Sequence, residues 1–340
     1  MCPVPDPVPS LAFPETPSVT GAAVPVQIGD ALARCGAGSW ADRSLTTEGH
    51  FYPRRTMKAA ARLAYYASQL PVVEVSSTQY FPPTPELSQQ WVDRTPPGFM
   101  MDLRGWSLLT GAPTMPDSLW EDMRDQVRPE VRDRRRLYPQ HMSPDAVDEC
   151  WARFAHAIRP LARAGRLGCV ILTYPSWFTP KDETWAELRL ARMRLPDYPL
   201  AVDFRSPKWT TDDRCEDTLA FLEDHDLAFV CVDGSVGLSP VVAATAELSV
   251  VRFVGRRPPP EPPRAESDTE AAADEEPDHW HWPWPYRYSD DELAGWVPSV
   301  QELAESSRDV HLIFANTWRD DAVDNAVSLS RLLRLPDPAR

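Results

Sequence analysis

Eight short apolar segments alternate with segments of helical spacing along this chain, and that alternation limits the possible folds more than any other feature. The apolar segments are typical of buried β-strands. Parallel strands need a crossover between neighbours, and eight of them leave no edge only when the sheet closes. We therefore predict an α/β fold, a TIM-type (β/α)8 parallel barrel, with strands at Leu32 to Ser39, Val72 to Thr78, Phe99 to Arg104, Leu167 to Tyr174, Leu200 to Arg205, Ala228 to Asp233, Ser249 to Gly255 and Val310 to Asn316.

Helical spacing accounts for most of the connections. One connection is an exception, because Pro240 to Glu247 is long enough for only about two turns of helix. The predicted helices are Met57 to Gln69, Pro85 to Arg94, Pro144 to Ala164, Lys181 to Met193, Asp212 to Asp224, Ser289 to Ser306 and Asp320 to Leu333.

The predicted organisation is a proline-rich N-terminal arm, residues 1–28, followed by a single barrel domain, residues 29–336. Two insertions interrupt the domain. Residues 105–142 carry a mixed-charge run and are expected to add helix over the barrel. Residues 257–278, after the seventh strand, are rich in proline and acid, a composition typical of disorder.

Composition narrows the class of protein. The net charge of −15 opposes phosphate attraction and makes nucleic acid an improbable partner. No signal peptide and no membrane span are recognisable, and the six cysteines lack C-x-x-C spacing, so we expect a cytoplasmic protein with reduced thiols. The oligomeric state is left open.

Five of the predicted strands carry a charged or polar residue inside an apolar run. A buried charge costs several kcal/mol unless it is paired or used, so charges in five strands predict a shared polar centre. In a parallel barrel that centre lies at the carboxyl ends of the strands. The runs are Val73-Glu74-Val75, Val202-Asp203-Phe204-Arg205, Val232-Asp233, Val251-Arg252-Phe253 and Phe314-Ala315-Asn316.

Several of these motifs resemble, in order, the YecE-like family, known as domain of unknown function 72. The resemblance covers roughly residues 30 to 335. It implies a TIM-type barrel loosely likened to sugar isomerases, in a family whose reaction is not established. Ser76, Arg104 and Asp203 depart from the family pattern. The resemblance rests on Gly36-Ala37-Gly38-Ser39-Trp40, Phe51-Tyr52-Pro53, Val73-Glu74-Val75-Ser76-Ser77-Thr78-Gln79-Tyr80, Asp203-Phe204-Arg205, Val232-Asp233, Val251-Arg252-Phe253-Val254-Gly255-Arg256, Tyr286-Arg287-Tyr288-Ser289 and Phe314-Ala315-Asn316.

The candidate site contains three carboxylates and a larger set of binding residues. Glu74, Asp203 and Asp233 are candidate catalytic groups. Alternation places Glu74, Ser76 and Thr78 on one strand face. Aromatic rings after the seventh strand either stack on a sugar or pack a loop, and both readings stay open. The candidate substrate-binding residues are Trp40, Ser76, Thr78, Arg104, Arg205, Arg252, Arg256, Trp284, Tyr286 and Asn316.

No cofactor is implied, although a divalent metal is possible. The three carboxylates and Asn316 offer oxygen ligands for a hard cation, whereas zinc would need richer histidine spacing. The pair His279 and His281 is a weak ligand motif.

Two classes of function follow. In the first, the chain is an enzyme acting on a small sugar, polyol or sugar phosphate by acid/base isomerisation, with Glu74 or Asp203 as base and Arg205 or Arg252 binding an anionic group. A two-carboxylate hydrolase is a variant. In the second, the barrel binds a small molecule or a partner without catalysis. A structural alternative is a charge network that only fills the barrel.

Overall fold

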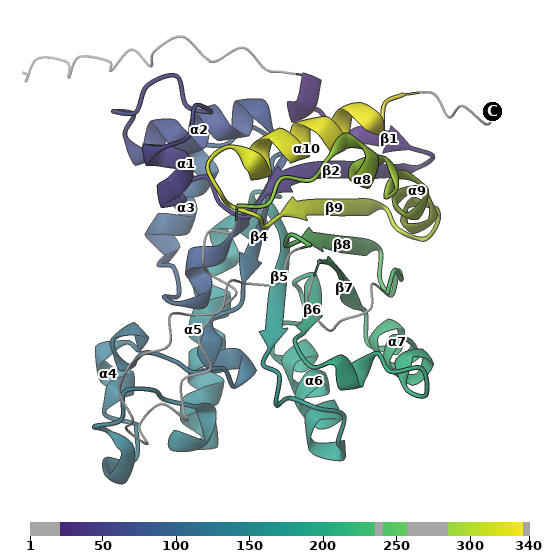
Figure 1. Ribbon diagram of the computed structural model, residues 1–340. Coiled ribbons are helices and arrows are strands. Elements are labelled where there is room, and N and C mark those ends of the chain that lie inside the picture. The colour runs from purple at the N-terminus through teal and green to yellow at the C-terminus, as the bar shows by residue number, and fades with distance from the viewer. Residues whose placement is uncertain (1–20, 235–240, 257–284, 336–340) are drawn as a thin grey trace, which may run out of the picture.

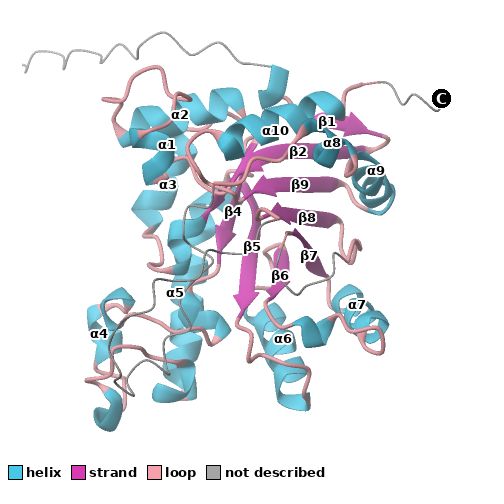
Figure 2. Ribbon diagram, viewed as in Figure 1, coloured by secondary structure: helices cyan, strands magenta, loops and turns pink. Residues whose placement is uncertain are grey.

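The computed structural model describes residues 21–234, 241–256 and 285–335. Eight parallel strands form a closed sheet, because β9 pairs with β2, and the helices lie outside it (Figures 1 and 2). The predicted TIM-type (β/α)8 barrel is therefore confirmed. The barrel strands are β2 (Ala31–Ala37), β3 (Val72–Val75), β4 (Met100–Arg104), β5 (Leu167–Tyr174), β6 (Leu200–Phe204), β7 (Leu227–Asp233), β8 (Leu248–Phe253) and β9 (Asp309–Phe314).

A ninth strand precedes the barrel. Strand β1 (Val26–Ile28) pairs antiparallel with β2 through a tight turn in which Gly29 has φ +56°. Glycine takes this left-handed conformation without strain. The end of the predicted proline-rich arm is thus part of the sheet, and residues 1–20 of the arm lie outside the described residues.

Most helices begin within three residues of their predicted positions. Ser143 and Thr84 cap α5 and α3 through their hydroxyls. The predicted helix from Ser289 to Ser306 is two helices, because Pro298 lacks the N–H that would continue α8 into α9. The helices are α1 (Arg43–Thr47), α2 (Ala59–Gln69), α3 (Pro85–Asp93), α5 (Pro144–Arg163), α6 (Asp182–Arg194), α7 (Cys215–Asp224), α8 (Asp290–Ala294), α9 (Val297–Ser306) and α10 (Asp321–Leu332).

The insertion at residues 105–142 contains short pieces rather than a long extra helix. Three of these pieces begin with a proline, which is tolerated in the first turn of a helix because the N–H it lacks would be unpaired there. Figure 1 shows this region around α4, beside α5. The pieces are η3 (Ser107–Thr110), η4 (Pro116–Ser118), α4 (Glu121–Arg124), η5 (Pro129–Val131) and η6 (Pro139–His141).

The connection between β7 and β8 also departs from the ideal pattern. The described residues 241–247 form no helix. Thr245 instead donates to the Leu227 carbonyl and accepts from the Phe229 N–H, which ties the segment to β7. The acidic insertion, residues 257–278, lies outside the described residues.

Side chains along each strand alternate between the barrel interior and the helix layer. The larger core lies between strands and helices. A separate apolar cluster fills one side of the interior, along β5 to β8, and consists of Cys169, Ile171, Ala201, Ala228, Val230, Val232, Leu248 and Val250. The rest of the interior carries charged side chains, and these form the candidate site.

Candidate functional site

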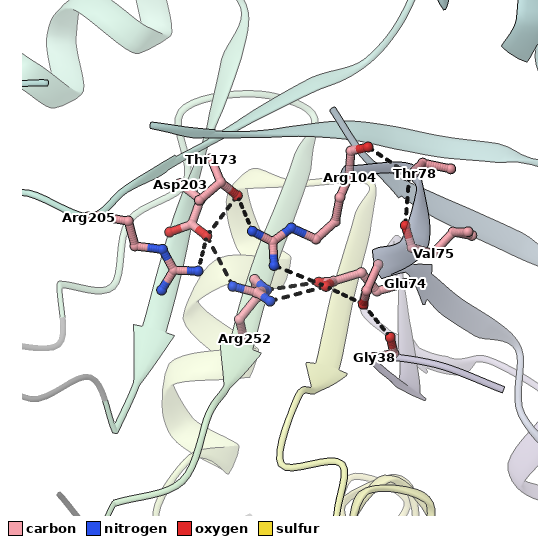
Figure 3. A network of polar contacts seen from close by, with 10 residues as sticks. Gly38, Glu74, Val75, Thr78, Arg104, Thr173, Asp203, Arg205 and Arg252 are labelled. Carbon is pink, nitrogen blue, oxygen red and sulfur yellow. Dashed lines mark hydrogen bonds and ion pairs between the residues drawn. The ribbon is translucent and has the colours of Figure 1, made fainter. Parts of the chain in front are cut away.

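Five charged side chains gather inside the barrel near the carboxyl ends of four strands. We call them the mouth cluster: Glu74 from β3, Arg104 from β4, Asp203 from β6 with Arg205 directly after that strand, and Arg252 from β8 (Figure 3). All five are buried, with Glu74 and Asp203 fully so. Residues far apart in sequence thus meet because strand alternation turns each of them inward.

Arg252 lies at the centre of the mouth cluster. Its Nε and Nη2 donate to the two carboxylate oxygens of Glu74 at 2.8 and 3.1 Å, and its Nη1 donates to Asp203 Oδ2 at 3.0 Å. Burial alone lowers the pKa of Arg252, but the two carboxylates outweigh it, so this pKa lies above its ordinary value. Arg252 therefore holds both carboxylates in place.

One carboxylate oxygen of Asp203 makes all of its hydrogen bonds, and the other makes none among the described residues. Its Oδ2 lies 3.0 Å from Arg205 Nη2 and 3.2 Å from the Thr173 hydroxyl, in addition to Arg252. Its Oδ1 is buried and has no hydrogen-bond partner within the described part of the chain. Burial opposes ionisation, but Arg205, Arg252 and Arg104 outweigh it, so the pKa of Asp203 lies below its ordinary value. Asp203 is therefore a carboxylate at neutral pH.

Arg104 is held less tightly than Arg252. Its Nη2 donates to Thr173 at 2.9 Å, its Nη1 is 3.9 Å from Glu74 Oε1, and its buried Nε has no hydrogen-bond partner among the described residues. Burial and the nearby charge of Arg252 lower the pKa of Arg104. Burial, partly offset by Asp203, lowers the pKa of Arg205 to about 10. Both guanidinium groups still carry their charge at neutral pH.

The mouth cluster carries an excess of positive charge. It contains three guanidinium groups, of Arg104, Arg205 and Arg252, and two carboxylates, of Glu74 and Asp203. A net charge in a low-dielectric interior is unfavourable without a counter-charge. The arrangement therefore suits a small anionic ligand.

Ser76 and Thr78 lie beside the mouth cluster, but not on one strand face with Glu74 as the sequence predicts. Strand β3 ends at Val75 and continues into η2 (Ser76–Gln79), so these residues do not share one strand face with Glu74. Ser76 Oγ, which is partly exposed, lies 2.6 Å from the Gly38 carbonyl and 3.2 Å from Glu74 Oε1. Thr78 donates to the backbone carbonyls of Val75 and Arg104. Ser76 joins the network, and Thr78 supports the backbone.

Asp233 and Arg256 lie outside the mouth cluster, which corrects the expected grouping of three carboxylates. Val232 of β7 is paired with Arg252, so alternation turns the next residue, Asp233, toward the helix layer. There Asp233 accepts hydrogen bonds from Arg256 at 2.8 and 2.6 Å and from Trp296 Nε1. This pair fastens the end of β7 to the helix layer.

Asn316, Tyr286 and Trp40 also make contacts away from the cluster. Asn316 Nδ2 donates to the Tyr286 carbonyl at 2.7 Å and to Asn325 Oδ1 at 3.0 Å. Tyr286 hydrogen-bonds Glu292 through its hydroxyl. Trp40 packs edge-on against Trp91, with ring centroids 5.9 Å apart. Trp284 and the pair His279 and His281 lie outside the described residues.

Glu74, Asp203 and Asp233 do not come together in the way that a metal site would require. Among the described residues, no group of three or more His, Cys, Asp or Glu side chains lies close enough together to hold a metal ion. The reason is the outward orientation of Asp233 and the arginine between Glu74 and Asp203.

A second ionic group in the barrel was missed. We call it the floor cluster, because it lies toward the amino-terminal ends of the strands. His311 Nδ1 lies 2.9 Å from both oxygens of Asp102, and Arg34 Nε lies 2.6 Å from Asp309 Oδ1. Asp102 and His311 are fully buried. Both interrupt apolar runs, Met101-Asp102-Leu103 and Val310-His311-Leu312, so the rule that identified Glu74 would have found them.

The fold and the interior cluster define a class: a TIM-type barrel whose polar centre lies at the carboxyl ends of its strands. Residues 34–339 match the family described as Protein of unknown function DUF72, and the chain belongs to that family.

Relatives of known sequence or structure agree with this assignment. The chain is 26% identical over 287 residues to the UPF0759 protein YunF of Bacillus subtilis (strain 168), covering 83% of this chain and 89% of that one. A crystal structure of a DUF72 family protein from Enterococcus faecalis V583 is similar with a TM-score of 0.65 and 22% identity, covering 90% of this chain and 96% of that one. One from Thermotoga maritima MSB8 has a TM-score of 0.64 and 21% identity, covering 89% and 99%. These likenesses support the fold.

Within the described residues, no helix has both the length and the apolar character needed to cross a lipid bilayer.

Proposed function

We propose that this chain is an enzyme that binds a small sugar with a carbonyl group and an anionic group and moves a proton on it, with Asp203 as the base. One observation carries the proposal: Asp203 Oδ1 is a buried, ionised oxygen with no hydrogen-bond partner among the described residues, set beside an excess of guanidinium charge. Glu74 suits the role of base less well, because both of its oxygens accept hydrogen bonds from Arg252.

The proposed step is an isomerisation. Asp203 Oδ1 takes the proton from a hydroxyl-bearing carbon next to a carbonyl group. The C–H electron pair forms a carbon–carbon double bond, and the π pair of the carbonyl group moves onto its oxygen, which gives an enediolate. Arg205 and Arg252, which flank Asp203, supply positive charge for that oxyanion. The hydroxyl proton of the second carbon then moves to the first oxygen. Asp203 returns its proton to the former carbonyl carbon, and the carbonyl group forms at the second carbon.

The position of Arg252 weighs against a two-carboxylate hydrolase. Such an enzyme holds the glycosidic bond between its two carboxyl groups, with room for water in the inverting class. Here one guanidinium lies between Glu74 and Asp203 and hydrogen-bonds both. Proton transfer needs only one free carboxylate, so it fits this geometry better.

Binding and deuterium exchange test the proposal together. Thermal-shift measurements on the full chain with neutral, carboxylate-bearing and phosphate-bearing monosaccharides identify ligands that raise the Tm. Each such ligand is then incubated with the protein in D2O and followed by proton NMR. We expect loss of the C–H signal next to the carbonyl group, because a carboxylate base exchanges its proton with solvent.

A matched pair of variants completes the test. Asp203→Asn should abolish the exchange and keep the ligand-induced Tm shift, whereas Asp102→Asn in the floor cluster should keep both. Binding without exchange in the wild-type chain would favour the non-catalytic binding barrel. No stabilisation by any monosaccharide would end the proposal.

A further inference from the structure

Arg104 is the least neutralised guanidinium of the mouth cluster. Arg252 makes three hydrogen bonds to carboxylate oxygens, and Arg205 lies 3.0 Å from Asp203. Arg104 has one hydrogen bond, to the neutral hydroxyl of Thr173, and the carboxylate it faces, Glu74, is 3.9 Å away. Only 3% of its side chain is exposed to solvent, and its Nε lacks a hydrogen-bond partner in the described part of the chain. Arg104 therefore has N–H donors that are available to hydrogen-bond a ligand.

We infer that the ligand of this site carries a single carboxylate, as a sugar acid does, and that Arg104 binds that carboxylate. The inference rests on the proposed function and specifies its substrate class. A guanidinium presents parallel N–H donors that match the two oxygens of a carboxylate.

The charge count selects a carboxylate over a phosphate. Three guanidinium groups face two carboxylates, so one additional negative charge neutralises the mouth cluster. A phosphate ester brings a charge of about −1.5 to −2 at neutral pH and would leave the buried cluster negative. Because uncompensated charge in the interior is unfavourable, a monoanion is the better match.

Thr173 connects this binding group to the proposed base. Its hydroxyl accepts a hydrogen bond from Arg104 Nη2 and donates one to Asp203 Oδ2, at 2.9 and 3.2 Å. A carboxylate bound by Arg104 therefore places the rest of the ligand beside Asp203. Figure 3 shows Thr173 between the two side chains.

Four probes of related shape test the inference on the full chain: D-gluconate, D-glucuronate, D-glucose 6-phosphate and the neutral polyol D-glucitol. Isothermal titration calorimetry should give at least one of the two carboxylates a Kd ten-fold or more below those of D-glucose 6-phosphate and D-glucitol. Arg104→Met should raise the Kd of that carboxylate ten-fold or more and remove its advantage. Arg34→Met, which deletes a buried arginine of the floor cluster, should leave the Kd within two-fold.

The outcomes separate this inference from the proposed function. Phosphate binding as tight as carboxylate binding, or a carboxylate Kd unchanged in Arg104→Met, would overturn the carboxylate assignment and leave the proposed enzyme standing. If none of the four probes binds the wild-type chain, the carboxylate assignment fails. If, in addition, no monosaccharide in the thermal-shift series stabilises the chain, the proposed function fails with it. Circular dichroism spectra that match the wild type show that both variants are folded.

Discussion

The mouth cluster and the floor cluster are both polar groups inside the same barrel, but they differ in how their side chains are paired. In the floor cluster, Asp102 faces His311 with both oxygens at 2.9 Å, and Arg34 faces Asp309 at 2.6 Å. In the mouth cluster, three guanidinium groups face two carboxylates. The floor cluster is organised as two pairs, and the mouth cluster has one more guanidinium group than it has carboxylates.

The unmatched atoms differ as well. The mouth cluster leaves Asp203 Oδ1 and Arg104 Nε without hydrogen-bond partners among the described residues. The floor cluster leaves His311 Nε2 without one, 3.8 Å from Asp309. A carboxylate oxygen and a guanidinium donor near the strands' carboxyl ends are suited to a ligand. A single imidazole nitrogen that already faces a carboxylate is suited to holding strands together.

Burial of charge does not by itself indicate function, because both clusters contain buried ionisable side chains. Buried ion pairs are often neutral for stability or even unfavourable relative to apolar packing. What marks the mouth cluster is its surplus of guanidinium groups over carboxylates, together with its place at the carboxyl ends of the strands. This difference can be tested by removing single groups from each cluster.

Removal of Arg252 should have the largest effect. The variant Arg252→Met removes the guanidinium that hydrogen-bonds both oxygens of Glu74, and it also removes one of the ion-pair partners of Asp203. Breaking a buried pair in this way costs about 3–5 kcal/mol of stability. Urea unfolding followed by circular dichroism measures the change. A loss below about 1 kcal/mol, the range of exposed pairs, would show that water already reaches the cluster.

Removal of Arg34 and of Arg104 should separate the two clusters. Arg34→Met loses the ion pair with Asp309 and a hydrogen bond to the Gly98 carbonyl, at a cost of about 1.5–3 kcal/mol. Arg104→Met leaves Glu74 and Asp203 still paired with Arg252, so its stability should stay within about 1 kcal/mol of the wild type.

The two variants are measured side by side by urea unfolding. A larger loss in Arg104→Met than in Arg34→Met would contradict the view that Arg104 is kept for a ligand, because function rather than stability is expected to preserve an unmatched buried charge.

Much of the fold could be predicted from the sequence, because the strands are apolar runs and the helices have recognisable starts, such as Ser143 before Pro144. The short strand β1 was missed, since three residues give little periodic signal. The break between α8 and α9 was missed although Pro298 marks it.

The site was predicted in part. The sequence predicts site roles for Glu74, Arg104, Asp203, Arg205 and Arg252, and these five side chains lie together in the barrel. The prediction for the position of Asp233 was wrong. The register of a strand with its neighbours decides which of its residues face the barrel interior, and a single sequence does not give that register. Likewise, the sequence does not show that β3 ends at Val75, because the following Ser-Ser-Thr run gives no clear signal for the end of a strand.

Close packing of the floor cluster gives a further prediction. A methyl group at Gly168 would lie 2.1 Å from Asp102 Oδ1 and 2.8 Å from His311 Cε1, closer than atoms pack. Gly168→Ala should therefore destabilise the chain by about 1–3 kcal/mol, the usual effect of overpacking. Thermal unfolding would measure it. An unchanged Tm would mean that Asp102 and His311 can move apart freely, against the paired description of this cluster.

The smallest effect should appear in the acid range. Because the pKa of Asp203 is lower in the folded chain than its ordinary value of 3.8, the unfolded chain binds more protons as pH falls below about that value. The stability that Asp203 contributes is present above the unfolded pKa and is lost as pH falls through the folded pKa. Between pH 5 and pH 3, the free energy of unfolding of the Asp203→Asn variant should thus fall less steeply than that of the wild type.

Asp321 supplies a control of opposite sign. Burial raises its pKa above the ordinary value despite the attraction of Arg287, so in acid the folded chain binds this proton more readily than the unfolded chain does. Asp321→Asn should therefore make the acid loss steeper than in the wild type. Urea unfolding at each pH measures both slopes. Equal slopes in the Asp203→Asn variant and the wild type would mean that the three guanidinium groups do not favour ionised Asp203. The guanidinium surplus that marks the mouth cluster would then lose its support.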